Sequence, residues 1–246
     1  MNPSRLIAER LRELEQPQSK VPEKSAVHQM RVAARRLRAA LRILRLRRLD
    51  PAVKALQDAL GGVRDLQLQI EWLSSRDETL TRGREARLRK AEQTLENALQ
   101  RWRAQTAPAL LDAGVHARAP HRRRVRKVVR NRLRRLEARL EQARARPTPR
   151  SVHRARISVK QVRYLIEVGE KLLPSRVVRT VADLKSLQAS LGQLHDADLR
   201  IGLVKTRPLL LREQREAREH LAKIVSSQLT RWKKQEVAAH ALKRLQ

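Results

Sequence analysis

The chain has 246 residues, of which 41% are hydrophobic, which is enough apolar material for a folded core. Lys and Arg number 57 against 25 Asp and Glu, so the formal net charge of +32 predicts an acidic partner that neutralises it. The lack of cysteine excludes disulfides, thiolate catalysis and zinc–thiolate sites, and no apolar run approaches the roughly 20 residues of a membrane span, so we expect a soluble, cytoplasmic protein.

The composition favours helices over strands, because the chain has no Phe, one Tyr, three Trp and only 7 Gly beside many Leu, Ala, Arg and Glu. After an amphipathic helix over 1–16, clusters of turn-forming residues divide the chain into about ten predicted helices of an all-α fold. The predicted breaks lie at 17–22, 50–51, 61–62, 74–77, 113–120, 146–149, 174–175, 192 and 206–208.

Two of these breaks are predicted from glycine. Gly61 and Gly192 each follow a leucine-periodic run, where a helix often ends in a left-handed residue. Asp65 and Asp196 come shortly afterwards, and we expect them to cap the next helix or to hold an arginine in place.

An ordered pair of segments occurs twice in the chain. The segment 27–38 returns as 152–163 with the same chemistry at the same spacing, and the segment 56–65 returns in the same order as 187–196. This repetition predicts a duplicated unit, with a first half over 1–146 and a second over 147–246. We expect each half to be a four-helix bundle and the two to be related by pseudo-symmetry.

In both copies, basic side chains follow the apolar stripe of a helix one position later, at steps of three and four residues. The first row is His28, Arg31, Arg35, Arg38, Arg42 and Arg45; the second is His153, Arg156, Lys160 and Arg163; a third on another helix is Arg123, Arg126 and Arg130. Like charges at this spacing repel by a few tenths of a kcal/mol per pair, so we expect an extended polyanion to compensate the first row, which contains no acid.

The residue types of the rows point to phosphate. Arginine forks bind phosphate oxygens in pairs, lysine supplies a point charge, and histidine donates from a ring nitrogen. The second row is shorter, because Glu167 and Glu170 stand where the first copy has Arg42 and Arg45. The two halves need not bind equally.

Other interpretations remain open. His28 and His153 can be structural histidines, and the charge can be solvated surface, although recurrence in two copies favours phosphate ligands. Nucleic acid is a possible secondary partner, but the few aromatic residues are scattered and no helix-turn-helix or zinc-finger pattern occurs. The sequence contains no P-loop and no group of carboxylates that would indicate an enzyme, so we expect no catalytic residue, cofactor or metal. A phosphorylated histidine is formally possible.

These motifs resemble the CHAD (conserved histidine α-helical domain) family. The residues that carry the resemblance are His28 with Arg31, Arg35 and Arg38, the Leu60-Gly61 to Arg64-Asp65 segment, His153 with Arg156, Lys160 to Glu167, and Leu191-Gly192 to Asp196. The resemblance covers essentially the whole chain, so that 1–246 forms a single module. It implies two bundles, a central basic cavity or groove lined by the two repeat helices, and binding of inorganic polyphosphate, often on polyphosphate granules. His195 departs from the first copy, which has Arg64 there, and no ExExK-like motif suggests hydrolysis.

Overall fold

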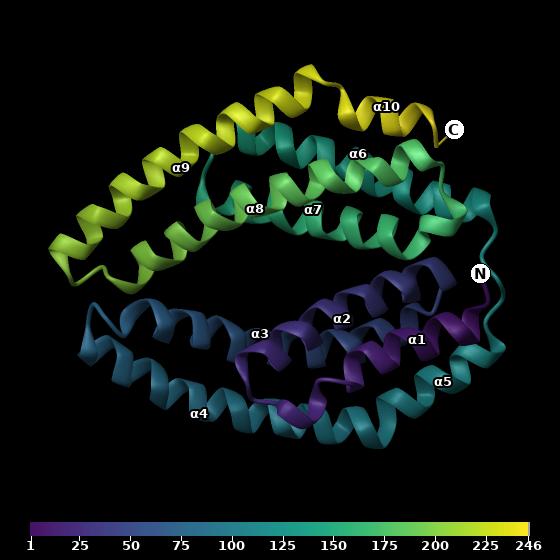
Figure 1. Cartoon of the computed structure of the whole chain (residues 1–246), viewed down its shortest axis with the longest axis horizontal. Helices are drawn as coiled ribbons and strands as arrows, with labels where there is room; N and C mark the ends of the chain where they lie inside the picture. The colour runs from purple at the N-terminus through teal and green to yellow at the C-terminus, as the bar shows by residue number, and fades with distance from the viewer. Residues whose placement is uncertain (246) are drawn as a thin grey trace. The chain divides into compact units, whose positions relative to one another are not determined.

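The structure, a computed structural model, describes residues 1–245 and contains helices but no strand within that range. The all-α prediction is confirmed. The chain divides into two compact units, Met1–Pro120 and His121–Gln246, whose helices are drawn in Figure 1. Each unit has its own buried core. None of the described helices is both long enough and apolar enough to cross a membrane.

The first unit contains helices α1 to α5. Their bounds are α1 Pro3–Glu15, α2 Lys24–Leu44, α3 Asp50–Leu73, α4 Glu78–Arg101 and α5 Ala107–His116, with 3-10 turns at Gln18–Lys20 and Arg47–Leu49 and a π-helical turn at Trp102–Thr106. Helix α2 packs against α1 and α3, and α4 forms an antiparallel pair with α3 (Figure 1). Val27, Met30 and Leu37 of α2 are fully buried, as their three- and four-residue spacing predicts.

The second unit contains helices α6 to α10. Their bounds are α6 Arg122–Ala145, α7 Pro149–Gly169, α8 Ser175–Leu203, α9 Pro208–Lys234 and α10 Val237–Lys243, with a 3-10 turn at Glu170–Leu172. Helix α7 packs against α6 and α8, and α9 packs against α8. The order of α1 to α4 therefore recurs in α6 to α9, with α2 matched by α7 and α3 matched by α8.

The division between the units differs from the predicted boundary at 146/147. That boundary falls between α6 and α7, which pack against each other inside the second unit. The segment Arg146–Thr148 ends one helix and starts the next, because the Thr148 hydroxyl accepts a hydrogen bond from the Ser151 N–H at 3.2 Å. A break in the chain is thus not a break in the core, and α6 corresponds to α1 instead of closing the first unit.

The predicted turns at Gly61 and Gly192 are wrong. Gly61 lies inside α3 and Gly192 inside α8, so Asp65 and Asp196 are also helical and cap nothing. A glycine inside a helix costs about 1 kcal/mol relative to alanine. Burial of the neighbouring residues Leu60 and Leu191 outweighs this cost locally. Each glycine lies beside an arginine of the preceding helix.

Candidate anion-binding rows

The first row follows α2 from its first turn to its end. His28 is exposed, whereas Arg31, Arg35 and Arg42 are half-buried beside the apolar stripe. Arg45 lies just after the helix, in a left-handed conformation with φ of 66°, where its backbone N–H bonds to the Leu41 carbonyl. The residues of the predicted row from His28 to Arg42 therefore lie on α2, whereas Arg45 is the C-cap of that helix.

Arg31 is held against the neighbouring helix α3. Its guanidinium donates to the Asp65 carboxylate at 3.0 Å, and its side chain is only 18% exposed. The guanidinium passes over Gly61, where a Cβ would come within 3.9 Å of the Arg31 terminal nitrogen. Asp65 thus holds an arginine of the row in place, which was one of its two predicted roles, and Gly61 leaves space for that arginine.

Arg38 donates more hydrogen bonds to α3 than Arg31 does. It donates two hydrogen bonds to the Asp50 carboxylate, at 2.7 and 3.0 Å, and a third to the Gln57 side-chain oxygen at 3.3 Å. Both charged side chains are mostly buried, with 18% of Arg38 and 24% of Asp50 exposed. Carboxylates of α3 therefore compensate Arg31 and Arg38, so part of the charge that we expected a polyanion to balance is balanced within the protein.

In the second unit, Arg163 occupies the place that Arg38 has in the first. It is buried and donates to the Gln188 side-chain oxygen at 3.0 Å, which repeats the contact between Arg38 and Gln57. Its carboxylate partner is different, because Glu167 of the same helix accepts at 2.8 Å, and its guanidinium lies 4.2 Å from the centre of the Tyr164 ring. Arg163 is thus a structural residue of the core edge and is not presented to solvent.

Arg156 repeats the position of Arg31. A Cβ on Gly192 would lie 3.8 Å from the Arg156 Nε, so a helical glycine again adjoins an arginine of the row. Arg156 and Lys160 are both half-buried on α7, between the exposed His153 and the buried Arg163. In the second unit, the side chains available at the surface are therefore those in the first half of the row.

His153 contacts a second histidine, His195, and the sequence did not predict this contact. Its Nδ1 lies 3.4 Å from the Nε2 of His195 on α8, and the two ring centres are 4.7 Å apart. Partial burial lowers the pKa of His153, and the positive charges of Arg156 and Lys160 lower it further. A bound anion would oppose that effect and favour the protonated imidazole.

The third predicted row lies along α6. Arg123 is exposed, and Arg126 and Arg130 are half-buried next to the buried Val125 and Val129. The Nε atoms of Arg126 and Arg130 are buried without a hydrogen-bond partner. These three residues lie together on α6, and their contribution to the polyphosphate-binding surface stays a prediction.

Sequence reasoning missed two features of these rows. Asp50 is a predicted helix-start residue, but its pairing with Arg38 requires α2 and α3 to be packed together. The contact between His153 and His195 also joins two helices, and the only available signal is that His195 lies one residue before Asp196 in the repeated segment. Among residues 1–245, no group of three or more His, Asp or Glu side chains is arranged to hold a metal ion.

The fold and the rows define an all-helical protein with a duplicated basic helix, each copy of which packs against the helix that follows it. The family model described as CHAD domain matches residues 5–205, and the chain belongs to this family. A solved structure described as the CHAD domain from the plant Ricinus communis is similar in fold, with a TM-score of 0.61 and 20% identity over 92% of this chain and 90% of that one. A comparison with curated proteins gave no match.

Proposed function

We propose that this protein binds inorganic polyphosphate along the rows of α2 and α7 and does not catalyse a reaction on it. The observation that carries the proposal is an arginine of each row beside a helical glycine of the next helix: Arg31, which Asp65 holds, lies over Gly61, and Arg156 lies next to Gly192. A guanidinium held in place loses little conformational entropy when it binds an anion. The same arrangement occurs in two copies, which supports a shared ligand chemistry.

The length of a row suits a chain of phosphates better than a single one. From His28 to Arg42 the axis of α2 rises by about 20 Å at about 1.5 Å per residue, so successive charges of an extended polyanion can meet successive cations. The partly neutralised arginines fix the spacing, while His28, Arg35 and Arg42 complete the row. Recruitment of the protein to polyphosphate granules would follow from such binding.

The aromatic residues favour polyphosphate over single-stranded nucleic acid. Trp102, Tyr164 and Trp232 are buried, and the ring of Trp72 has the Arg76 guanidinium 5.1 Å from its centre. Binders of single strands commonly stack bases on exposed aromatic rings. Because three of these rings are buried and the fourth is covered in part by Arg76, base stacking should contribute little to the affinity of this protein for nucleic acid.

The test is a titration of the purified protein with long-chain polyphosphate near physiological salt, with duplex DNA and RNA as competitors. The row variant replaces Arg31, Arg35, Arg156 and Lys160 with Gln. The control variant replaces Arg87, Arg89, Arg215 and Lys223 with Gln; these side chains are exposed, and the control removes the same charge from each unit.

We expect the row variant to lose about 100-fold in affinity or more, because charge-assisted contacts to phosphate are strong, and the control to lose only a few-fold. The slope of log affinity against log salt should fall by about 3 in the row variant, at about 0.7 per lost phosphate contact. Equal losses in the two variants, with circular dichroism showing both folded, would refute the assignment to the rows. Displacement by DNA or RNA as effective as by polyphosphate would make the protein a general polyanion binder.

A further inference from the structure

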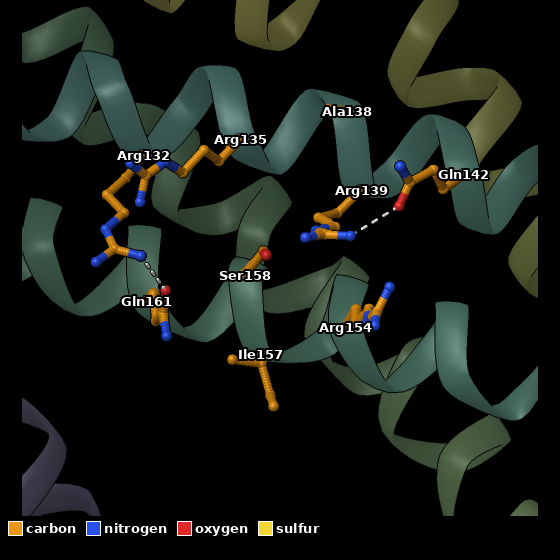
Figure 2. A pocket seen from close by; sticks show the side chains of 9 residues that line it. All are labelled: Arg132, Arg135, Ala138, Arg139, Gln142, Arg154, Ile157, Ser158 and Gln161. Atoms are coloured by element: carbon orange, nitrogen blue, oxygen red, sulfur yellow. Dashed lines mark hydrogen bonds between the residues drawn. The ribbon is translucent and has the colours of Figure 1, made fainter.

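The second unit contains a basic groove that is separate from the second row. It lies between α6 and α7 and has a volume of about 420 Å³. Its lining residues are Arg132, Arg135, Ala138, Arg139 and Gln142 of α6 and Arg154, Ile157, Ser158 and Gln161 of α7 (Figure 2). None of them belongs to the predicted rows.

Two of the residues that line this groove have small side chains. Ala138 of α6 and Ser158 of α7 leave a volume that larger side chains would fill, and arginines from both helices surround it (Figure 2). On α7, Ser158 lies at two residues from both Arg156 and Lys160, so the groove faces a different side of the helix from the row. A ligand of the groove therefore need not touch the row.

Two of the arginines that line the groove donate hydrogen bonds to neutral side chains. Arg132 donates to the Gln161 side-chain oxygen at 2.7 Å, and Arg139 donates to that of Gln142 at 2.9 Å (Figure 2). These amides orient the guanidinium groups without cancelling their charge. Arg154 lies across the groove from Arg139 in the same view and forms no ion pair with a described carboxylate.

Two carboxylates of α6, Glu137 and Glu141, lie close to the groove in sequence, but neither lines it. Glu141 accepts hydrogen bonds from Arg144, at 2.6 and 3.1 Å, and lies 3.4 Å from the Lys233 ammonium. The Arg144 hydrogen bonds, together with the charges of Arg144 and Lys233, hold the pKa of Glu141 at about 2. No carboxylate is among the residues that line the groove, which brings four guanidinium groups together.

We propose that this groove is a second anion site, which takes a compact oligophosphate of about three phosphoryl groups. Four guanidinium groups from two facing helices match the charge of such a ligand, and the Ser158 hydroxyl adds a neutral donor between them. The groove contains no aromatic ring to hold a base, so its specificity is for the phosphates alone. A nucleoside triphosphate should bind no tighter than tripolyphosphate.

The test follows the methyl resonance of Ala138 by NMR during titration with tripolyphosphate, ATP or inorganic phosphate. The titration uses the full-length row variant, in which the contacts proposed for long polyphosphate are removed, so that success or failure at the groove is independent of the rows. Three proteins are compared in this background: one with no further change, a groove variant with Arg135, Arg139 and Arg154 replaced by Gln, and a control with Lys205, Arg215 and Lys223 replaced by Gln. The control side chains are exposed in the same unit.

We expect tripolyphosphate to shift the Ala138 resonance saturably, at least 10-fold more tightly than inorganic phosphate, and the groove variant to lose at least 10-fold in affinity while the control changes less than about 3-fold. A further variant, Ser158→Phe, keeps all four arginines and fills the groove, and it should also abolish the shift. No saturable shift, an equal loss in the control, or unchanged binding in Ser158→Phe would each overturn the proposal. Tighter binding of ATP would reassign the ligand to one whose nucleoside is recognised.

Discussion

The pair formed by Arg38 and Asp50 should be one of the main electrostatic contributions to the stability of the first unit. It has two hydrogen bonds, and three-quarters or more of each side chain is buried. Hydrogen bonds between charged groups contribute about 1.5–3 kcal/mol to stability. The pair should contribute less than this upper value, because both side chains keep some exposure and an asparagine at position 50 can still accept a hydrogen bond. Replacing Asp50 with Asn should therefore lower the free energy of unfolding by about 1–2 kcal/mol, or about 2–8 °C in Tm for a chain of this length.

The same helix offers a matched control. Lys54 and Asp58 form an ion pair on α3 with both side chains more than half exposed, so Asp58→Asn should cost less than about 0.5 kcal/mol. Urea unfolding followed by tryptophan fluorescence, with Trp232 replaced by Phe in every protein compared, reports on the first unit through its two remaining tryptophans.

Double-mutant cycles separate the pair from the helix-terminus effect of Asp50, which lies in the first turn of α3. We expect a coupling energy of about 1–2 kcal/mol for Arg38→Gln with Asp50→Asn and below about 0.5 kcal/mol for Lys54→Gln with Asp58→Asn. Equal coupling in the two cycles would show that the buried pair adds nothing beyond a surface ion pair, and the account of Arg38 as a braced residue would be wrong.

Three further predictions concern single positions. In the free protein the pKa of His153 lies below its ordinary value, and a bound anion should raise it. Polyphosphate affinity should therefore increase as the pH falls below about 6.5. Binding titrations over that range should show a weaker pH dependence in His153→Gln. Arg45→Gly should raise the free energy of unfolding by about 1 kcal/mol in urea, because Arg45 has φ of 66°, and an unchanged midpoint would contradict this. Gly61→Ala should be tolerated, since its Cβ would make an ordinary 3.9 Å contact with Arg31, whereas Gly61→Leu should displace that arginine and weaken polyphosphate binding; equal affinities of the two folded variants would refute the role of Gly61.

The helices and the rows were predictable because both depend on spacing along one helix. The three- and four-residue steps of Val27, Met30 and Leu37 identify the buried stripe, and His28 and Arg31 follow it by one position. Repetition of this pattern in α7 identified the duplication, and the matching helix order of the two units agrees with it. Local periodicity was therefore sufficient for the fold class and for the position of the rows.

Features that join two helices were not predictable in the same way. Arg38 looks like another phosphate ligand in the sequence, and only the packing of α3 shows that Asp50 and Gln57 already bind it. Gly61 and Gly192 look like helix ends, because a glycine that makes space for a neighbouring arginine has no separate signature in one sequence. The boundary at 146/147 was misplaced for a related reason, since Pro147 lies between two helices and Pro149 begins α7, and both helices belong to one core.

Helix α5 determines where the first unit can be cut. Gly114 brings α5 so close to α1 that a Cβ there would lie 3.2 Å from the Cβ of Ile7, and Ile7 has no exposed surface. A proteolytic fragment that ended before Ala107 would uncover this side of the N-terminal helix and should aggregate. A fragment that extended to Pro120 would keep the helix covered, so α5 is the element on which independent expression of the first unit depends.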